Sequence, residues 1–94
     1  MIRFRLPELL LVRERMEGRR ISWREVGLAT GIAPQTVTNL ASRTQTVVTN
    51  TRYIEALCRY FGCGPQDLME FDPPLDQPYT CRVDELYPPA QRDD

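Results

Sequence analysis

Residues 22–40 read SWREVGLATGIAPQTVTNL and are the most informative segment of the sequence. It predicts two short helices joined by a tight turn. Ser22 and Glu25 have the spacing of a capping box, in which the serine hydroxyl accepts a hydrogen bond from the Glu25 amide and the glutamate carboxylate reaches back to the Ser22 amide. The first helix is therefore expected to begin at Trp23. Gly31 supplies the positive φ angle that the turn after it requires.

The second helix of this stretch is expected to span about residues 34–42, because proline suits the first helical position. Its apolar stripe is narrow and centres on Val37 and Leu40, which we expect to face the body of the protein. Gly27 lies where the two helices are expected to cross, since only a tiny side chain permits a close approach there. The opposite face of the second helix is polar but uncharged and consists of Gln35, Thr36, Thr38 and Asn39.

The flanking sequence predicts three more helices and a short strand. One helix is expected over about residues 7–17, one between the cap Asn50 and the stop Gly62, and a short one from 65 to about 69. Residues 2–6 alternate apolar side chains with arginine, which is the pattern of a strand. Five amphipathic helices in a chain of this length predict a small all-α domain.

Charge divides the 94-residue chain into two parts. The net charge is −1, and all twelve basic residues are arginine. Residues 1–71 contain ten arginines against seven acidic residues, a balance of +3, whereas residues 72–94 have a balance of −4 and five of the eight prolines. We therefore predict one domain over residues 1–71 and an acidic, proline-rich tail over residues 72–94.

Composition argues against catalysis and against a metal site. Histidine is absent, which removes the commonest general base and the commonest metal ligand. Three irregularly spaced cysteines fall short of the usual four zinc ligands, and no glycine-rich phosphate loop is present. The sequence thus predicts a protein that is not an enzyme and has no cofactor. It also has no apolar run long enough to span a bilayer and no signal-peptide core, so a cytoplasmic protein without a membrane partner is expected.

Two partners for the N-terminal strand stay open. It can pair with Glu70-Phe71 or with residues 79–83, which also alternate like a strand. Either pairing forms a small β element, within one chain or across a dimer. The third alternative is that the proline-rich tail is a flexible segment.

A helix, a glycine turn and a second helix with an uncharged polar face form the helix-turn-helix arrangement that reads DNA. Residues 3–71 resemble the phage-repressor and Cro-type helix-turn-helix family, and in particular its small bacterial regulators. The resemblance rests on residues 2–6, 22–27, 30–32, 35–40, 54–58, 62–63 and 67–70. It implies a five-helix repressor-like domain that inserts the second helix of the motif into the major groove, usually as a dimer on a palindromic site.

The resemblance also implies roles for particular residues. Those expected to read bases are Pro34, Gln35, Thr38 and Asn39. Among these, Gln35 and Asn39 can each pair with adenine, the Thr38 methyl group can contact a thymine methyl group, and Pro34 offers only a shape contact. Those expected to contact phosphates are Ser22, Trp23, Arg24, Thr36 and Arg43. One departure from the family pattern is Ala33, which replaces the usual serine or threonine cap of the second helix.

From the sequence we predict a sequence-specific transcriptional regulator that binds double-stranded DNA as a homodimer without a cofactor. The alternative is a protein-interaction adaptor or antitoxin-like partner, with the acidic tail as its binding segment. The weakly basic balance and the uncharged helix face favour that alternative. The DNA-binding hypothesis can be checked in the structure, because it requires Gln35 and Asn39 to point outward.

Overall fold

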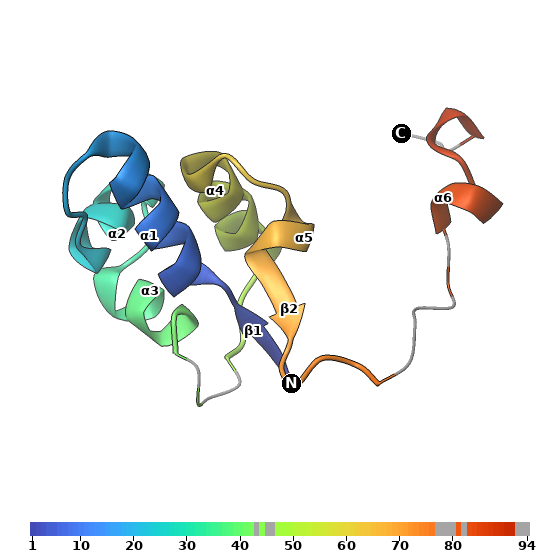
Figure 1. Cartoon of the computed structure of the whole chain (residues 1–94), viewed down its shortest axis with the longest axis horizontal. Coiled ribbons are helices and arrows are strands. Elements are labelled where there is room, and N and C mark those ends of the chain that lie inside the picture. The colour runs from blue at the N-terminus through green and yellow to red at the C-terminus, as the bar shows by residue number, and fades with distance from the viewer. Residues whose placement is uncertain (43, 45–46, 77–80, 82, 92–94) are drawn as a thin grey trace.

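The computed structural model describes the whole chain except residues 43, 45–46, 77–80, 82 and 92–94 (Figure 1). Its elements in chain order are β1 (Ile2–Phe4), α1 (Leu6–Glu17), α2 (Trp23–Thr30), α3 (Pro34–Leu40), α4 (Thr51–Phe61), α5 (Pro65–Leu68), β2 (Met69–Phe71), α6 (Val83–Leu86) and a 3-10 turn (Pro89–Gln91). The five helices and the strand predicted within residues 1–71 are all present. In the described part of the chain, no helix combines the length and the apolar character that crossing a membrane would need.

The core lies between α1–α5 and β1. Its most deeply buried side chains are Leu6, Val26, Val37, Leu40, Leu57 and Leu68. Each of the first five helices contributes at least one of these residues, so each of these five is held by its own apolar face. Figure 1 shows α6, which the sequence did not predict, standing apart from this helical body.

The small sheet joins the two ends of the helical body. β1 and β2 are antiparallel, with Ile2 opposite Phe71 and Phe4 opposite Met69. This confirms the first of the two predicted partners. The prediction of a strand over residues 79–83 is wrong at its described positions, because Val83 begins α6 and Cys81 belongs to no regular element. Residues 79, 80 and 82 lie outside the described residues.

An ion-pair cluster explains why β2 is the partner of β1. The guanidinium of Arg3 lies 2.6 Å from a Glu8 carboxylate oxygen and 2.7 Å from one of Glu70, the residue that faces Arg3 across the sheet. The Arg3 side chain is only 10% exposed, and Asp72 adds a third carboxylate at 3.7 Å. These carboxylates raise the pKa of Arg3, chiefly through the hydrogen bond to Glu8. The cluster therefore ties β1 to both α1 and β2.

The capping box at α2 is only half formed. The Ser22 hydroxyl accepts from the Glu25 amide at 3.1 Å, as predicted. The prediction of a reciprocal bond between the Glu25 carboxylate and the Ser22 amide is wrong. That carboxylate instead accepts from both terminal nitrogens of Arg19, at 2.9 and 2.5 Å. A bidentate guanidinium bond carries two charge-assisted hydrogen bonds and so outcompetes a single amide.

Other helix ends lie close to their predicted positions. α1 begins at Leu6, one residue early, and α3 ends at Leu40, two residues short of the predicted end. As expected for alanine, Ala33 makes no side-chain cap bond. α4 has both of its predicted ends, because the Asn50 side chain accepts from the Tyr53 amide at 2.9 Å and Gly62 has a φ angle of 68°.

Candidate nucleic-acid interface

Gly27 sets how closely α2 and α3 cross. A Cβ atom at this position would lie 2.7 Å from the Ile32 carbonyl oxygen and 3.4 Å from the Cα atom of Pro34. The turn is tied to the same residue, since the amides of Gly31 and Ile32 both donate to the Gly27 carbonyl, at 2.9 and 3.1 Å. α3 is therefore held against α2 at a distance that a larger residue does not allow.

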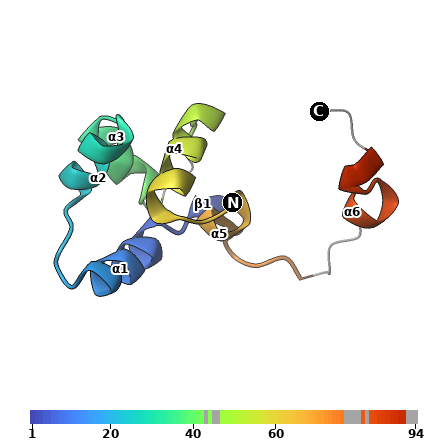
Figure 2. The same cartoon turned by 90° about the horizontal axis from the view of Figure 1, so that it is seen from above.

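Burial decides which face of α3 points outward. Val37 is fully buried and Leu40 is 2% exposed, so this side of the helix faces the core as predicted. Figure 2 shows α3 at one edge of the helical body, far from α6. The four residues predicted to read bases, Pro34, Gln35, Thr38 and Asn39, are all exposed. The arrangement that the DNA-binding prediction requires is therefore present.

The exposed face of α3 carries two hydrogen bonds of its own. The Gln35 amide nitrogen Nε2 donates to Oδ1 of Asn39 at 3.1 Å, and the Thr38 hydroxyl donates to the Pro34 carbonyl at 3.0 Å. The sequence prediction treated Gln35 and Asn39 as separate readers and missed their bond. Their spacing of four residues was the available signal, because such residues are neighbours on a helix surface.

The predicted phosphate contacts are in different environments. Ser22 is exposed, and its hydroxyl serves as the α2 cap. Trp23 is half-buried and packs against the core, as support for the start of the helix. Thr36 is also half-buried, whereas Arg24 is exposed and forms no ion pair with another described residue. Arg43 lies outside the described residues.

Ion pairs reduce the positive charge that is available to a polyanion. Five arginines of the helical body pair with carboxylates, namely Arg3, Arg5, Arg13, Arg19 and Arg59. The bond from Arg19 also lowers the pKa of Glu25, which keeps that pair charged. The exposed arginines that form no ion pair among the described residues are Arg15, Arg20, Arg24 and Arg52. The count of ten arginines over residues 1–71 therefore overstates the number of cations that are free for a ligand, since five of them are paired with carboxylates.

Arg52 is a candidate that the sequence prediction missed. It lies in the first turn of α4, two residues after the Asn50 cap. Figure 2 shows the start of α4 on the same side of the body as α3, with α1 on the opposite side. A basic residue next to a helix cap was the available signal, because helix N-termini favour anions.

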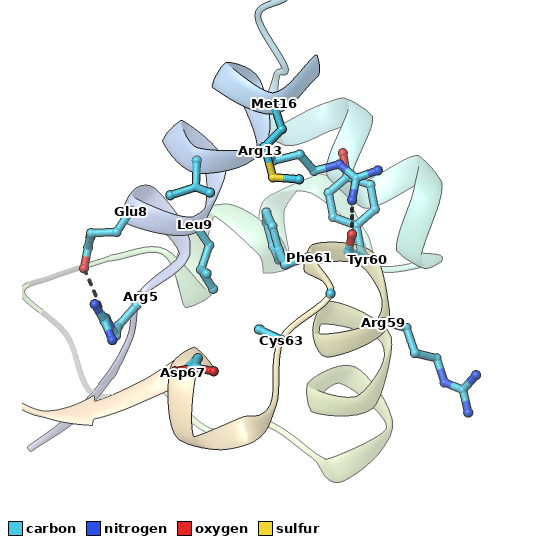
Figure 3. Close-up of a pocket in the computed structure, with 12 residues that line it drawn as sticks. Arg5, Glu8, Leu9, Arg13, Met16, Arg59, Tyr60, Phe61, Cys63 and Asp67 are labelled. Carbon is cyan, nitrogen blue, oxygen red and sulfur yellow. Dashed lines mark hydrogen bonds and ion pairs between the residues drawn. The ribbon is translucent and has the colours of Figure 1, made fainter. Parts of the chain in front are cut away.

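A groove between α1 and the end of α4 forms a separate surface (Figure 3). It has a volume of about 620 Å³ and includes Val12 and Met16, which are 56% and 82% exposed and not packed in the core. At the edge of the groove, the Arg13 guanidinium lies 4.0 Å from the centre of the Tyr60 ring. Burial raises the pKa of the Cys63 thiol, so this cysteine is not an activated nucleophile. The groove does not include any residue of α3.

Comparison with known proteins agrees with this geometry. A family model described as the Cro/C1-type HTH DNA-binding domain matches residues 12–74, about two thirds of the chain. The match includes α2, α3 and the crossing at Gly27. It supports DNA as the partner rather than the adaptor or antitoxin-like alternative. Neither the curated proteins nor the solved structures gave a match. The exposed α3, its support by α2 and the family match together show that the chain belongs to the Cro/C1-type helix-turn-helix family of DNA-binding domains.

Proposed function

We propose that this protein is a sequence-specific transcriptional regulator that reads the major groove with α3 and acts as a homodimer. The observation that carries the proposal is the orientation of α3. Its apolar side is buried through Val37 and Leu40, while its amide and hydroxyl side chains lie on the outer face. A major groove is about 12 Å wide and accepts an α-helix presented in this way.

Base reading falls to the outer face of α3. An amide side chain such as Gln35 or Asn39 offers the acceptor and donor that adenine requires, and each good bidentate pair contributes about 1–3 kcal/mol of discrimination. The Thr38 methyl group can contact a thymine methyl group. Pro34, at the exposed start of α3, has no hydrogen to donate and contributes shape.

Phosphate binding falls to residues around α3. We assign it to the exposed Arg24 and Arg52, which form no ion pair with another described residue, and to the first turn of α2, where the Ser22 and Trp23 amides lie at the positive end of the helix dipole. Thr36 and Arg43 complete the set predicted from the sequence. Because the α3 face is uncharged, these contacts supply the electrostatic affinity. Each phosphate contact makes the logarithm of the binding constant fall by about 0.9 for a tenfold increase in salt concentration.

We also propose the domain division at residue 72. All of the deeply buried core lies between Phe4 and Leu68. In the described part of the tail, the large apolar side chains of Leu75, Val83 and Leu86 are each at least half exposed. An acidic segment with exposed apolar residues is suited to a protein partner, and we assign that role to residues 72–94.

Selection of bound duplexes from random DNA tests the reading of bases. The wild-type protein should enrich a palindrome, as a dimer on two equivalent half-sites requires. Gln35→Ala should remove the preference at one base pair per half-site and leave non-specific affinity nearly unchanged, whereas Gln66→Ala, an exposed glutamine on α5, should change neither. The absence of duplex binding even at low salt would contradict the proposal.

Salt titration tests the phosphate contacts. Arg24→Ala and Arg52→Ala should each weaken binding to all sequences and lower the salt slope by about 0.9 per protomer, or about 1.8 for the dimer. Arg15→Ala is the matched control, because Arg15 is also exposed but lies on α1, on the opposite side from α3. A loss of specificity without a change in slope would contradict these roles. Sedimentation with and without the selected palindrome tests the dimer.

A further inference from the structure

We infer that Asn39, besides the base contact proposed for it, positions Gln35 so that Gln35 favours adenine over guanine. The inference rests on the proposed function and assigns the base that one site would select. Its starting observation is the 3.1 Å hydrogen bond from Nε2 of Gln35 to Oδ1 of Asn39 on the exposed face of α3.

The bond changes what Gln35 offers to a base. A glutamine amide has one acceptor oxygen and a nitrogen with two hydrogens. With one hydrogen given to Asn39, Gln35 keeps its oxygen Oε1 and a single N–H for a ligand. Adenine presents one donor, its N6 amino group, next to one acceptor, N7. The remaining groups of Gln35 match that pattern without breaking the bond to Asn39.

Guanine requires a different set of groups. It presents two adjacent acceptors in the major groove, O6 and N7. To satisfy both, Gln35 would have to use both hydrogens of Nε2 and release Asn39. The Asn39 oxygen would then lose its donor, and Oε1 of Gln35 would face a base edge that has no donor for it. Binding to guanine therefore costs the hydrogen bond between Gln35 and Asn39, and binding to adenine does not. A cost that falls on the competitor is one way in which a site gains specificity.

The helix that carries the two amides is firmly anchored. Gln35 and Asn39 are one helical turn apart on a helix anchored by Val37 and Leu40, which are buried. The hydroxyl of Thr38, which lies between them in sequence, donates to the Pro34 carbonyl and so does not donate to either amide. The Asn39 oxygen is thus the acceptor for Gln35 on this face.

A set of variants tests the inference in the full chain. The readout is the ratio of affinities for duplexes that carry adenine or guanine, in one half-site, at the base pair whose preference Gln35→Ala removes. Asn39→Ala should lower the adenine preference by about tenfold, mainly by improving binding to guanine, since about one hydrogen bond separates the two complexes. Asn39→Asp retains the acceptor and should keep the ratio, although its charge weakens binding to every duplex. In the Gln35→Ala background, Asn39→Ala should leave that base pair unchanged.

Three results would overturn the inference while the proposed function stands. These are an unchanged ratio in Asn39→Ala, a preference lost only at a base pair other than that of Gln35, which would make Asn39 a reader that does not act through Gln35, and a Gln35→Ala variant that loses its preference at a base pair where the wild type does not favour adenine over guanine. A wild-type protein that selects no sequence would instead refute the proposed function, and the inference with it. Both residues are exposed, so circular dichroism and thermal unfolding should show every variant folded as the wild type.

Discussion

Replacing Gly27 by alanine should destabilise the protein although alanine is the better helix former. The added methyl carbon would lie 2.7 Å from the Ile32 carbonyl oxygen, where ordinary contacts begin at 3.4 Å. The obstructing atom belongs to the backbone of the turn, and the Ile32 amide already donates to the Gly27 carbonyl. The clash can therefore be relieved only by moving the turn and α3 away from α2.

The magnitude follows from two opposing effects. Overpacking costs about 1–3 kcal/mol, and an unyielding backbone atom puts this position at the upper end of that range. The gain in helix propensity from glycine to alanine offsets about 1 kcal/mol. The free energy of unfolding should therefore fall by about 1–2 kcal/mol, which lowers Tm by roughly 4–16 °C for a domain of this size.

Urea and thermal unfolding followed by circular dichroism measure this effect. Ala29→Gly, at an exposed position of the same helix, is the matched control, because it changes propensity alone and should cost about 1 kcal/mol. Gly27→Ala should also reduce sequence-specific binding more than Ala29→Gly does, since α3 moves only in the former. An alanine variant as stable as the wild type or more so would refute the reasoning about the crossing.

Three further predictions concern the contacts that hold the helices. Ser22→Ala removes the α2 cap and should lower the free energy of unfolding by about 1 kcal/mol, measured by urea unfolding; no change would mean that the hydroxyl is not a cap in solution. Arg3→Met leaves three carboxylates without their main partner and should cost about 1–2 kcal/mol, whereas the exposed control Arg15→Met should cost little; equal effects would contradict the cluster. Arg19 holds the pKa of Glu25 below its ordinary value of 4.5, so this pair stabilises the fold above that pH and loses its contribution as the pH falls through the lower, folded value. Arg19→Met should therefore make the loss of stability on acidification shallower, and an unchanged pH profile would count against the ion pair.

Local signals made much of the fold predictable. Ser22 and Asn50 cap helices by bonding amides three residues away, and Gly31 and Gly62 end helices through their own φ angles. Such interactions act within one turn of the chain, so a sequence pattern contains all of their participants. The buried positions Val37 and Leu40 followed from helical spacing, and with them the outward direction of Gln35 and Asn39.

Contacts between residues distant in sequence, and the directions of side chains, could be seen only in the folded chain. The fold pairs Glu70-Phe71 with the N-terminal strand, because Arg3 finds carboxylates from α1 and β2 at the same place. In the folded chain the Glu25 carboxylate binds Arg19 and not the Ser22 amide, and Val12 lies exposed in a groove. The helices and their caps could thus be predicted from the sequence, because the interactions that form them are local. The availability of each charge and apolar side chain was decided only by folding, because ion pairing and burial depend on which neighbours the chain brings together.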